Sequence, residues 1–273
     1  MRTCHSPSLK AYNSGMTVEL SRVERRRAER RGRVTVVGVL GELLITGGVL
    51  VMAFLGWQLW LNNIISSNEQ KNEAVQASEQ WSIGDKGEGI TAAPADRPDP
   101  GAPKVDSAPG NAEHFGNIII PRFGADYTIP IRQGVGVKDV LAYGVGHYDG
   151  TQMPGDVGNV ALAAHRTGWG EPFRKIVDLQ VGDNIYIETE AGWYQYVYRS
   201  LEYVMPSGIG VIGAVPQMPD AAPTDRLLTL TSCNPVTTAA ERIIAYSVYE
   251  TWYPRAGGPP AEIAGIAQVA AAG

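Results

Sequence analysis

One run of nineteen residues without a formal charge, Leu43 to Leu61, most constrains what this 273-residue chain can fold into. At about 1.5 Å per residue, a helix of that length reaches roughly 28 Å, close to the thickness of a bilayer's hydrocarbon core. Trp57 and Trp60 fall where an interfacial aromatic belt is expected. The apolar stretch extends back to Val34, so the sequence predicts a transmembrane signal-anchor over residues 34–61.

The charge distribution orients this segment. Up to Arg33 the chain has nine Lys/Arg and three Asp/Glu, and the remainder has fourteen Lys/Arg and twenty-five Asp/Glu. Seven arginines between Arg22 and Arg33 place residues 1–33 in the cytoplasm as a basic arm, because positive charge stays inside. We therefore expect a single-pass cell-membrane protein whose remaining domain is extracellular. The acidic remainder argues against a nucleic-acid partner.

Two alternatives remain at the N-terminus. A cleaved signal peptide would use the small residues around Val75–Ala77, but these lie far beyond the apolar run, which is longer than an ordinary signal segment. The translation start can be Met1 or Met16. We favour an uncleaved anchor.

Composition divides the rest of the chain. Residues 62–113 lack sustained periodicity and become rich in Gly, Pro, Ala and Asp, which predicts a flexible extracellular linker. Residues 114–254 are enough for one sizeable core. Residues 255–273 are Ala-rich and are expected to be a disordered tail.

The compact domain is predicted to be all-β. Apolar runs separated by Gly and Pro predict many closely spaced strands, with short helices at 137–143 and 172–179, and favour a closed or nearly closed β-barrel. The expected strands are 116–120, 127–131, 159–164, 184–188, 193–204, 226–232 and 243–251.

Cys233 ends one of these runs, just before Asn-Pro, where Pro235 must stop the pairing of the strand. The only other cysteine is Cys4, which the predicted span separates from it. An unpaired cysteine outside the cell is a candidate reactive thiol. The structural alternative is a buried free cysteine that acts as a small hydrophobe.

Two further residues occupy comparable positions. His165 ends the apolar run 160–164 and precedes a Gly-rich loop, so it is a candidate general acid and base or a loop hydrogen-bond former. Arg242 begins the strand after Cys233, so it is a candidate oxyanion donor or an exposed ion-pair partner of Glu241 or Asp225. No metal-ligand spacing, phosphate loop or Gly-x-Ser-x-Gly elbow is present. We therefore expect neither a metal nor a cofactor.

Together these motifs resemble the sortases, the membrane-anchored cysteine transpeptidases of Gram-positive bacteria. The run Thr229–Cys233 is similar to the family's Thr-Leu-x-Thr-Cys strand, with Ser232 in place of the second Thr, and the residues leading to His165 resemble the histidine strand. The anchor and the Cys-Asn-Pro sequence look most like the actinobacterial class E sortases.

The resemblance implies an eight-stranded β-barrel in which Cys233 is the nucleophile, His165 the acid and base, and Arg242 the clamp of the oxyanion. The implied reaction cleaves a Leu-(Ala or Pro)-x-Thr-Gly sorting signal between Thr and Gly through a thioacyl-enzyme. The implied partners are surface proteins with such a signal and an amine-bearing cell-wall precursor. The residues expected to line the substrate site are His147, Tyr148, Thr231 and Ser232, and for His147 either a structural or a pocket-lining role is expected.

Two alternatives to this function stay open. One is a pilin-polymerising sortase, which would keep the chemistry and change the acceptor. The other is a non-catalytic tethered barrel that binds peptide or cell wall. Sequence does not choose between Ala and Pro in the signal, although the class resemblance favours Ala.

Overall fold

The structure is a computed structural model that describes residues 35–83, 92–94, 97 and 99–266. The chain divides into two compact units, residues 1–54 and 55–273. Helix α2 (Val36–Gly56) is the one helix in the described ranges that is long and apolar enough to cross a membrane, with a mean hydropathy of 2.1 and no buried residue. The predicted cytoplasmic arm, residues 1–33, lies outside the described residues.

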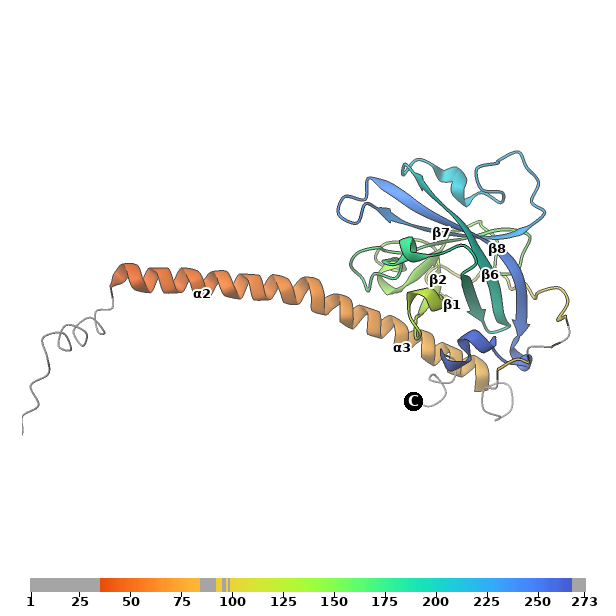
Figure 1. Cartoon of the computed structure of the whole chain (residues 1–273), viewed down its shortest axis with the longest axis horizontal. Coiled ribbons are helices and arrows are strands. Elements are labelled where there is room, and N and C mark those ends of the chain that lie inside the picture. The colour runs from red at the N-terminus through yellow and green to blue at the C-terminus, as the bar shows by residue number, and fades with distance from the viewer. Residues whose placement is uncertain (1–34, 84–91, 95–96, 98, 267–273) are drawn as a thin grey trace, which may run out of the picture. The chain divides into compact units, whose positions relative to one another are not determined.

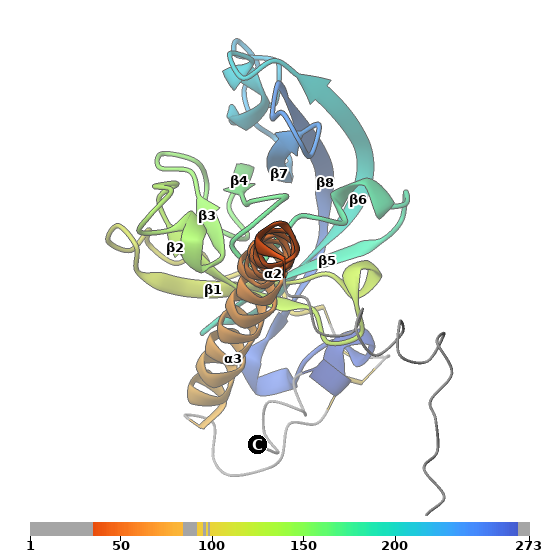
Figure 2. The ribbon, with the colours of Figure 1, turned by 90° about the vertical axis from the view of Figure 1, so that its left-hand side faces the viewer.

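The second unit contains an eight-stranded closed barrel, which confirms the predicted fold class (Figure 1). The order around the barrel is β1-β2-β3-β4-β7-β8-β6-β5, and the labels in Figure 2 can be followed in this order. Strands β2 and β3 pair in parallel, as do β4 and β7, and the other neighbours are antiparallel. The strands are β1 (His114–Ile119), β2 (Thr128–Gln133), β3 (Val145–His147), β4 (Gly158–Ala163), β5 (Asn184–Thr189), β6 (Gly192–Val204), β7 (Arg226–Asn234) and β8 (Glu241–Pro254).

Seven of these strands lie at the predicted runs, and β3 was not predicted. The two short helices expected in the domain are single 3₁₀ turns, Leu141–Tyr143 and Ile176–Asp178. The segment 172–179 contains Pro172, which lacks an N–H donor, and Phe173, which is fully buried. Packing of this loop onto the barrel therefore replaces the regular helix that local propensity suggested.

The core fills the barrel with alternate residues of the strands. On β7, Leu228 and Leu230 are fully buried in the interior cluster, and on β4 Val160 and Leu162 are as well. Burial of each such side chain stabilises the folded state by about 1.5–3 kcal/mol relative to leaving it exposed to water. Since side chains alternate between the two faces of a strand, the intervening residues of β4 and β7 face outward.

Residues 62–83 differ from the prediction of a flexible linker. A π-helical turn, Trp57–Leu61, is followed by helix α3 (Asn62–Ile83), which packs on β1, β2 and β5. Gln70, Ala74 and Ser78 recur every four residues and are almost fully buried, so one stripe of the helix faces the barrel. Residues 84–91 of the expected linker lie outside the described residues.

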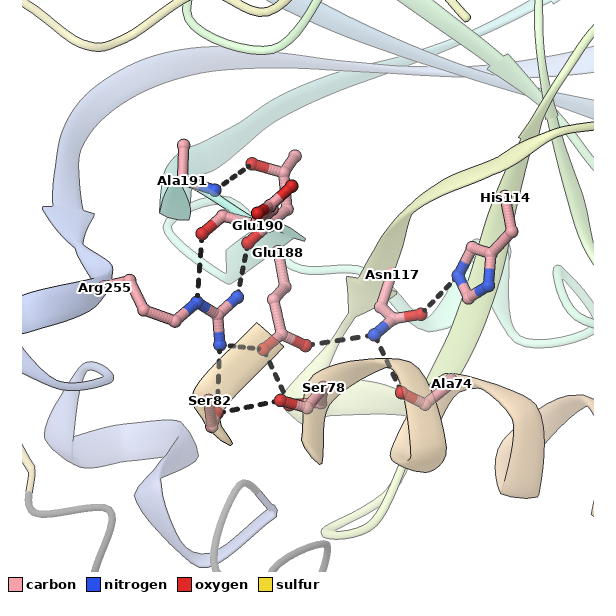
Figure 3. A network of polar contacts seen from close by, with 10 residues as sticks. Ala74, Ser78, Ser82, His114, Asn117, Glu188, Glu190, Ala191 and Arg255 are labelled. Carbon is pink, nitrogen blue, oxygen red and sulfur yellow. Dashed lines mark hydrogen bonds and ion pairs between the residues drawn. The ribbon is translucent and has the colours of Figure 1, made fainter. Parts of the chain in front are cut away.

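A polar network fastens α3 to the barrel (Figure 3). The Glu188 carboxylate on β5 accepts hydrogen bonds from Ser78 Oγ at 2.7 Å, Asn117 Nδ2 at 3.0 Å and Arg255 Nη1 at 2.9 Å. Asn117 Nδ2 also donates to the Ala74 carbonyl at 2.9 Å. The network therefore joins α3 to β1, β5 and the segment after β8.

The segment after Arg255 also differs from the expected disordered tail as far as residue 266. Two 3₁₀ turns, Arg255–Gly257 and Ala261–Ile263, follow β8. Ile263 is fully buried with Ile119, Tyr186 and Trp193 on the outside of the barrel. The Ala-rich composition did not reveal this contact because only two isoleucines of the segment, Ile263 and Ile266, join the cluster. Residues 267–273 lie outside the described residues.

Candidate active site

Cys233 lies near the end of β7 on the outward face of the strand. Leu228 and Leu230 of this strand face the core, and Cys233 shares the alternate positions with Thr229 and Thr231. The thiol is free, and the residue is half-buried. A rigid strand therefore presents the sulfur at the edge of the barrel wall.

The pairing of β4 with β7 brings His165 to the same edge. Ala163 pairs with Thr231 in a parallel ladder, so His165 and Cys233 each lie two residues beyond the same pair. The ladder continues in this direction, since the Ala164 N–H donates to the Thr231 carbonyl at 3.2 Å. His165 and Cys233 consequently lie at matching positions past one pair of neighbouring strands.

Arg242 lies directly opposite Cys233. The two residues are paired in the antiparallel ladder of β7 and β8, and side chains of such a pair project from the same face. Arg242 Nη1 donates to the carbonyls of Ala239 at 2.9 Å and Glu241 at 3.0 Å. Within the described residues, Nε and Nη2 of this guanidinium have no hydrogen-bond partner. The structure thus brings Cys233, His165 and Arg242 together at one end of three adjacent strands.

The His165 ring is partly shielded by the loop that follows it. Trp169 stacks on it with a centroid distance of 6.4 Å and an interplanar angle of 25°. His165 Nε2 is buried and has no hydrogen-bond partner in the described part of the chain. Burial lowers the pKa of His165, because a desolvated imidazole resists protonation. The ring is therefore predominantly neutral near pH 7 and has a nitrogen available for a further group.

Two residues of this neighbourhood were not singled out from the sequence. Trp169 lies between Gly168 and Gly170 and has a φ of +54°, a left-handed conformation that is uncommon outside glycine. Its carbonyl accepts a 2.8 Å hydrogen bond from Gln70 Nε2 on α3. The only sequence signal was a tryptophan between two glycines after the histidine. Gln70 gave none, because it lies about a hundred residues away.

The four predicted substrate-lining residues belong to the barrel wall. His147 is fully buried, with Nδ1 at 2.8 Å from Gln133 Oε1 and Nε2 at 2.9 Å from the Gln152 carbonyl. This arrangement occupies both ring nitrogens within the fold. Ser232 is also buried, and its hydroxyl donates to the Ala164 carbonyl at 2.7 Å, which ties β7 to the end of β4.

Thr231 and Tyr148 lie closer to the outward face. Their hydroxyls are 3.0 Å apart and hydrogen-bond each other. Thr231 is buried, and Tyr148 is half-buried above the strand that carries Cys233. A substrate role for these four residues stays a prediction.

The chain was compared with protein-family models, curated proteins and solved structures. Residues 118–250 match the model of the sortase domain. Sortase SrtE1 of Streptomyces coelicolor is 34% identical over 252 residues, and the match covers 88% of this chain but 66% of that protein, just under two thirds.

Two solved structures superpose on the barrel domain. The SrtA sortase from Actinomyces oris is 38% identical, with a TM-score of 0.57 over 60% of this chain and 94% of that chain. Sortase E1 from Streptomyces coelicolor with a tripeptide in the active site is 36% identical, with a TM-score of 0.52 over 58% of this chain and 99% of that chain. The chain therefore belongs to the sortase family, and the relatives that it resembles include the class E sortases.

Proposed function

We propose that this chain is a membrane-anchored cysteine transpeptidase that acts on a Leu-(Ala or Pro)-x-Thr-Gly sorting signal. The observation that carries the proposal is the register of β4, β7 and β8, which places a thiol, an imidazole and a guanidinium at one edge of the barrel. The tripeptide in the active site of a 36% identical sortase supports a peptide substrate. Helix α2 would serve as the single-pass anchor, with the barrel outside the cell.

The first half-reaction forms a thioacyl-enzyme. Neutral His165 takes the proton of the Cys233 thiol. The resulting thiolate attacks the carbonyl carbon of the Thr–Gly bond, and the carbonyl electrons move onto oxygen. Arg242 stabilises this oxyanion through Nε and Nη2, for which the described part of the chain supplies no hydrogen-bond partner. The carbon–nitrogen bond then breaks, and His165 gives its proton to the departing glycine amine. The products are a thioester on Cys233 and a free Gly-side peptide.

The second half-reaction transfers the acyl group. The amine of a cell-wall precursor attacks the thioester carbon, and neutral His165 accepts the proton that the amine loses. The carbon–sulfur bond breaks and releases the Cys233 thiolate, which takes the proton back from His165, while a new amide joins the Thr carbonyl to the acceptor. Proton transfer by one histidine in both directions requires that its pKa lie near the working pH.

The test uses the full chain in detergent micelles with fluorogenic Leu-Ala-x-Thr-Gly and Leu-Pro-x-Thr-Gly peptides. We expect cleavage between Thr and Gly and transfer to an added amine. Cys233→Ala should abolish both, and His165→Gln and Arg242→Ala should lower kcat about 10²–10³-fold or more. The matched control is Thr238→Ala, an exposed residue of the same β7–β8 loop.

Two results would replace the proposal. A folded wild type that binds these peptides without turning over any of them would make the chain a tethered binding module. Transfer to a pilin lysine but not to a wall-precursor amine would make it a pilin polymerase. Cleavage that survives Cys233→Ala would overturn the assignment of the nucleophile.

A further inference from the structure

Each of the three proposed catalytic residues has a polar neighbour in sequence. Arg166 follows His165, Asn234 follows Cys233, and Glu241 precedes Arg242. The first polar residue lies just beyond β4, the second ends β7 and the third begins β8. These neighbours therefore come from the same three strand ends that present the site.

The three polar residues are joined by hydrogen bonds. Arg166 Nη1 donates to Asn234 Oδ1 and, at 3.5 Å, to the carbonyl of Cys233. Asn234 Nδ2 donates to Glu241 Oε2 at 3.0 Å. The Asn234 amide thus accepts from a cation at one end and donates to a carboxylate at the other. This fixes the orientation of the amide, and each bond strengthens the next by polarisation.

The alternation of the strands places this chain of residues behind the site. Asn234 pairs with Glu241 in the β7–β8 ladder, one position beyond the pair of Cys233 with Arg242. Successive residues of a strand face opposite sides, so Asn234 and Glu241 project away from the face that carries the thiol and the guanidinium. These hydrogen-bonded residues can therefore tie the strand ends together without blocking a substrate.

The burial of Arg166 is costly for the fold. The residue is 7% exposed, and its Nε is buried without a hydrogen-bond partner in the described residues. Its described partners are an amide oxygen and a carbonyl, and it reaches the Glu241 carboxylate only through Asn234. A buried cation without a direct counter-ion is destabilising. Such exceptions to good packing are expected at functional sites.

We propose that Arg166, Asn234 and Glu241 form a positioning chain that holds His165, Cys233 and Arg242 in their catalytic arrangement. This proposal rests on the proposed function. Arg166 fixes the end of β4 to the end of β7 through two acceptors, one of which is the carbonyl of the nucleophile's own residue. Asn234 extends the link to β8. None of the three side chains needs to touch the substrate.

Loss of the positioning chain of Arg166, Asn234 and Glu241 should lower kcat more than it changes KM. A displacement of catalytic groups by about 1 Å can cost on the order of 100-fold in rate. Asn234→Ala removes both links and should lower kcat about 10–100-fold. Glu241→Gln keeps an oxygen acceptor for Asn234 Nδ2 and should retain most of the rate, whereas Glu241→Ala should not.

A test that needs no peptide substrate uses the full chain in detergent with Cys4→Ser, so that Cys233 is the only thiol. The rate of alkylation of Cys233 by iodoacetamide is measured from pH 5 to 10, with and without His165→Gln. In the otherwise wild-type chain we expect His165→Gln to shift this profile, because the imidazole and the thiol interact. In the Asn234→Ala chain we expect the same substitution to shift it much less. Thr238→Ala serves as the control that keeps the full shift.

The outcomes separate this proposal from the proposed function. If His165→Gln leaves the profile unchanged even in the otherwise wild-type chain, the two residues are not coupled, and the proposed mechanism and the positioning chain both fail. If the shift is equal in the wild-type and Asn234→Ala chains, and kcat falls less than threefold, the positioning chain is wrong and the proposed function stands. Should Asn234→Ala not fold, Glu241→Ala against Glu241→Gln gives the same comparison at a half-exposed residue.

Discussion

This barrel carries two polar networks, and they differ in how completely their polar side-chain atoms are paired by hydrogen bonds. Beneath α3, Glu188 accepts three side-chain hydrogen bonds, and in the described residues no buried polar side-chain atom of Glu188, Asn117, Ser78 or Arg255 lacks a partner (Figure 3). Behind the proposed site, Arg166 Nε in the positioning chain of Arg166, Asn234 and Glu241 has no hydrogen-bond partner among the residues that the structure describes, and the same is true of His165 Nε2 nearby.

The difference separates a structural role from a proposed functional one. A fully satisfied buried network contributes rigidity, whereas each buried polar group without a partner costs about 1–3 kcal/mol. The network under α3 has the properties of a fastening. His165 Nε2 keeps hydrogen-bonding capacity that a substrate can use, and Arg166 Nε is buried behind the site; both come at a cost to stability. We therefore expect substitutions in the first network to change stability and substitutions in the second to change rate.

The largest expected effect is that of Glu188→Ala on stability. Arg255 is 9% exposed at the side chain, so the substitution would leave its charge buried without a counter-ion. Breaking a buried pair in this way costs about 3–5 kcal/mol of the free energy of unfolding. Urea unfolding of the full chain measures the loss, and kcat per folded molecule should be unchanged. Glu190→Ala, at an exposed residue in the turn just after β5, should stay within about 0.5 kcal/mol. Equal effects of the two substitutions would contradict the account of the network.

A somewhat smaller effect is expected on removal of α3. A chain that starts at residue 82 loses the bonds of Ser78 to Glu188, of Asn117 to Ala74 and of Gln70 to Trp169. At about 1 kcal/mol each, the loss is roughly 3 kcal/mol, which lowers Tm by about 6–12 °C for a domain of this size. Thermal unfolding of residues 55–273 against 82–273 gives the measurement. An unchanged Tm would restore the view of this segment as a loose linker.

Gln70→Ala should combine a small loss of stability with a change in rate. Gln70 holds the Trp169 carbonyl, and Trp169 stacks on His165, so this residue connects α3 to the site. We expect a loss of about 1 kcal/mol in the free energy of unfolding and a several-fold lower kcat. Gln76→Ala, on an exposed position of the same helix, is the matched control. A kcat that is equal for the two variants would confine α3 to a purely structural role.

The smallest expected effect is a shift in the pH profile. Burial lowers the pKa of His165, so the acid limb of kcat/KM should lie below the ordinary histidine value of about 6.5. Trp169→Ala admits water to the ring, raises its pKa and should move the acid limb upward by a fraction of a unit. Rates of wild type and variant from pH 4 to 10 measure the shift. An acid limb that moves downward in the variant would contradict burial as the cause.

The sequence predicted the barrel better than the parts that surround it. Strands of five or more residues carry enough alternation to be recognised. Strand β3 was missed because it has only three residues, with Gly144 immediately before it and Gly146 within it. Its parallel pairing with β2 is also a long-range contact. The location of Cys233, His165 and Arg242 at the ends of strands could be predicted, because each residue lies next to an apolar run or close to a proline.

Helix α3 was missed for a physical reason. Its barrel-facing stripe consists of Gln70, Ala74 and Ser78, which are polar or small, so hydrophobic periodicity gives no signal. The helix is stabilised by hydrogen bonds to residues far along the chain, such as Asn117 and Glu188. The same holds for Arg166, Asn234 and Glu241, whose mutual contacts depend on the register of three strands. Properties that arise only from tertiary pairing could not be predicted from local patterns.

The most direct test of the account is the mass of the trapped acyl-enzyme. The full chain with Cys4→Ser is mixed with a Leu-Ala-x-Thr-Gly peptide, quenched with acid within one turnover and mapped by mass spectrometry. We predict an adduct equal to the peptide up to its threonine, attached as a thioester to Cys233, which accumulates when no acceptor amine is present. An adduct on any other residue, or cleavage of the peptide by a folded wild type without an adduct on Cys233, would contradict the account.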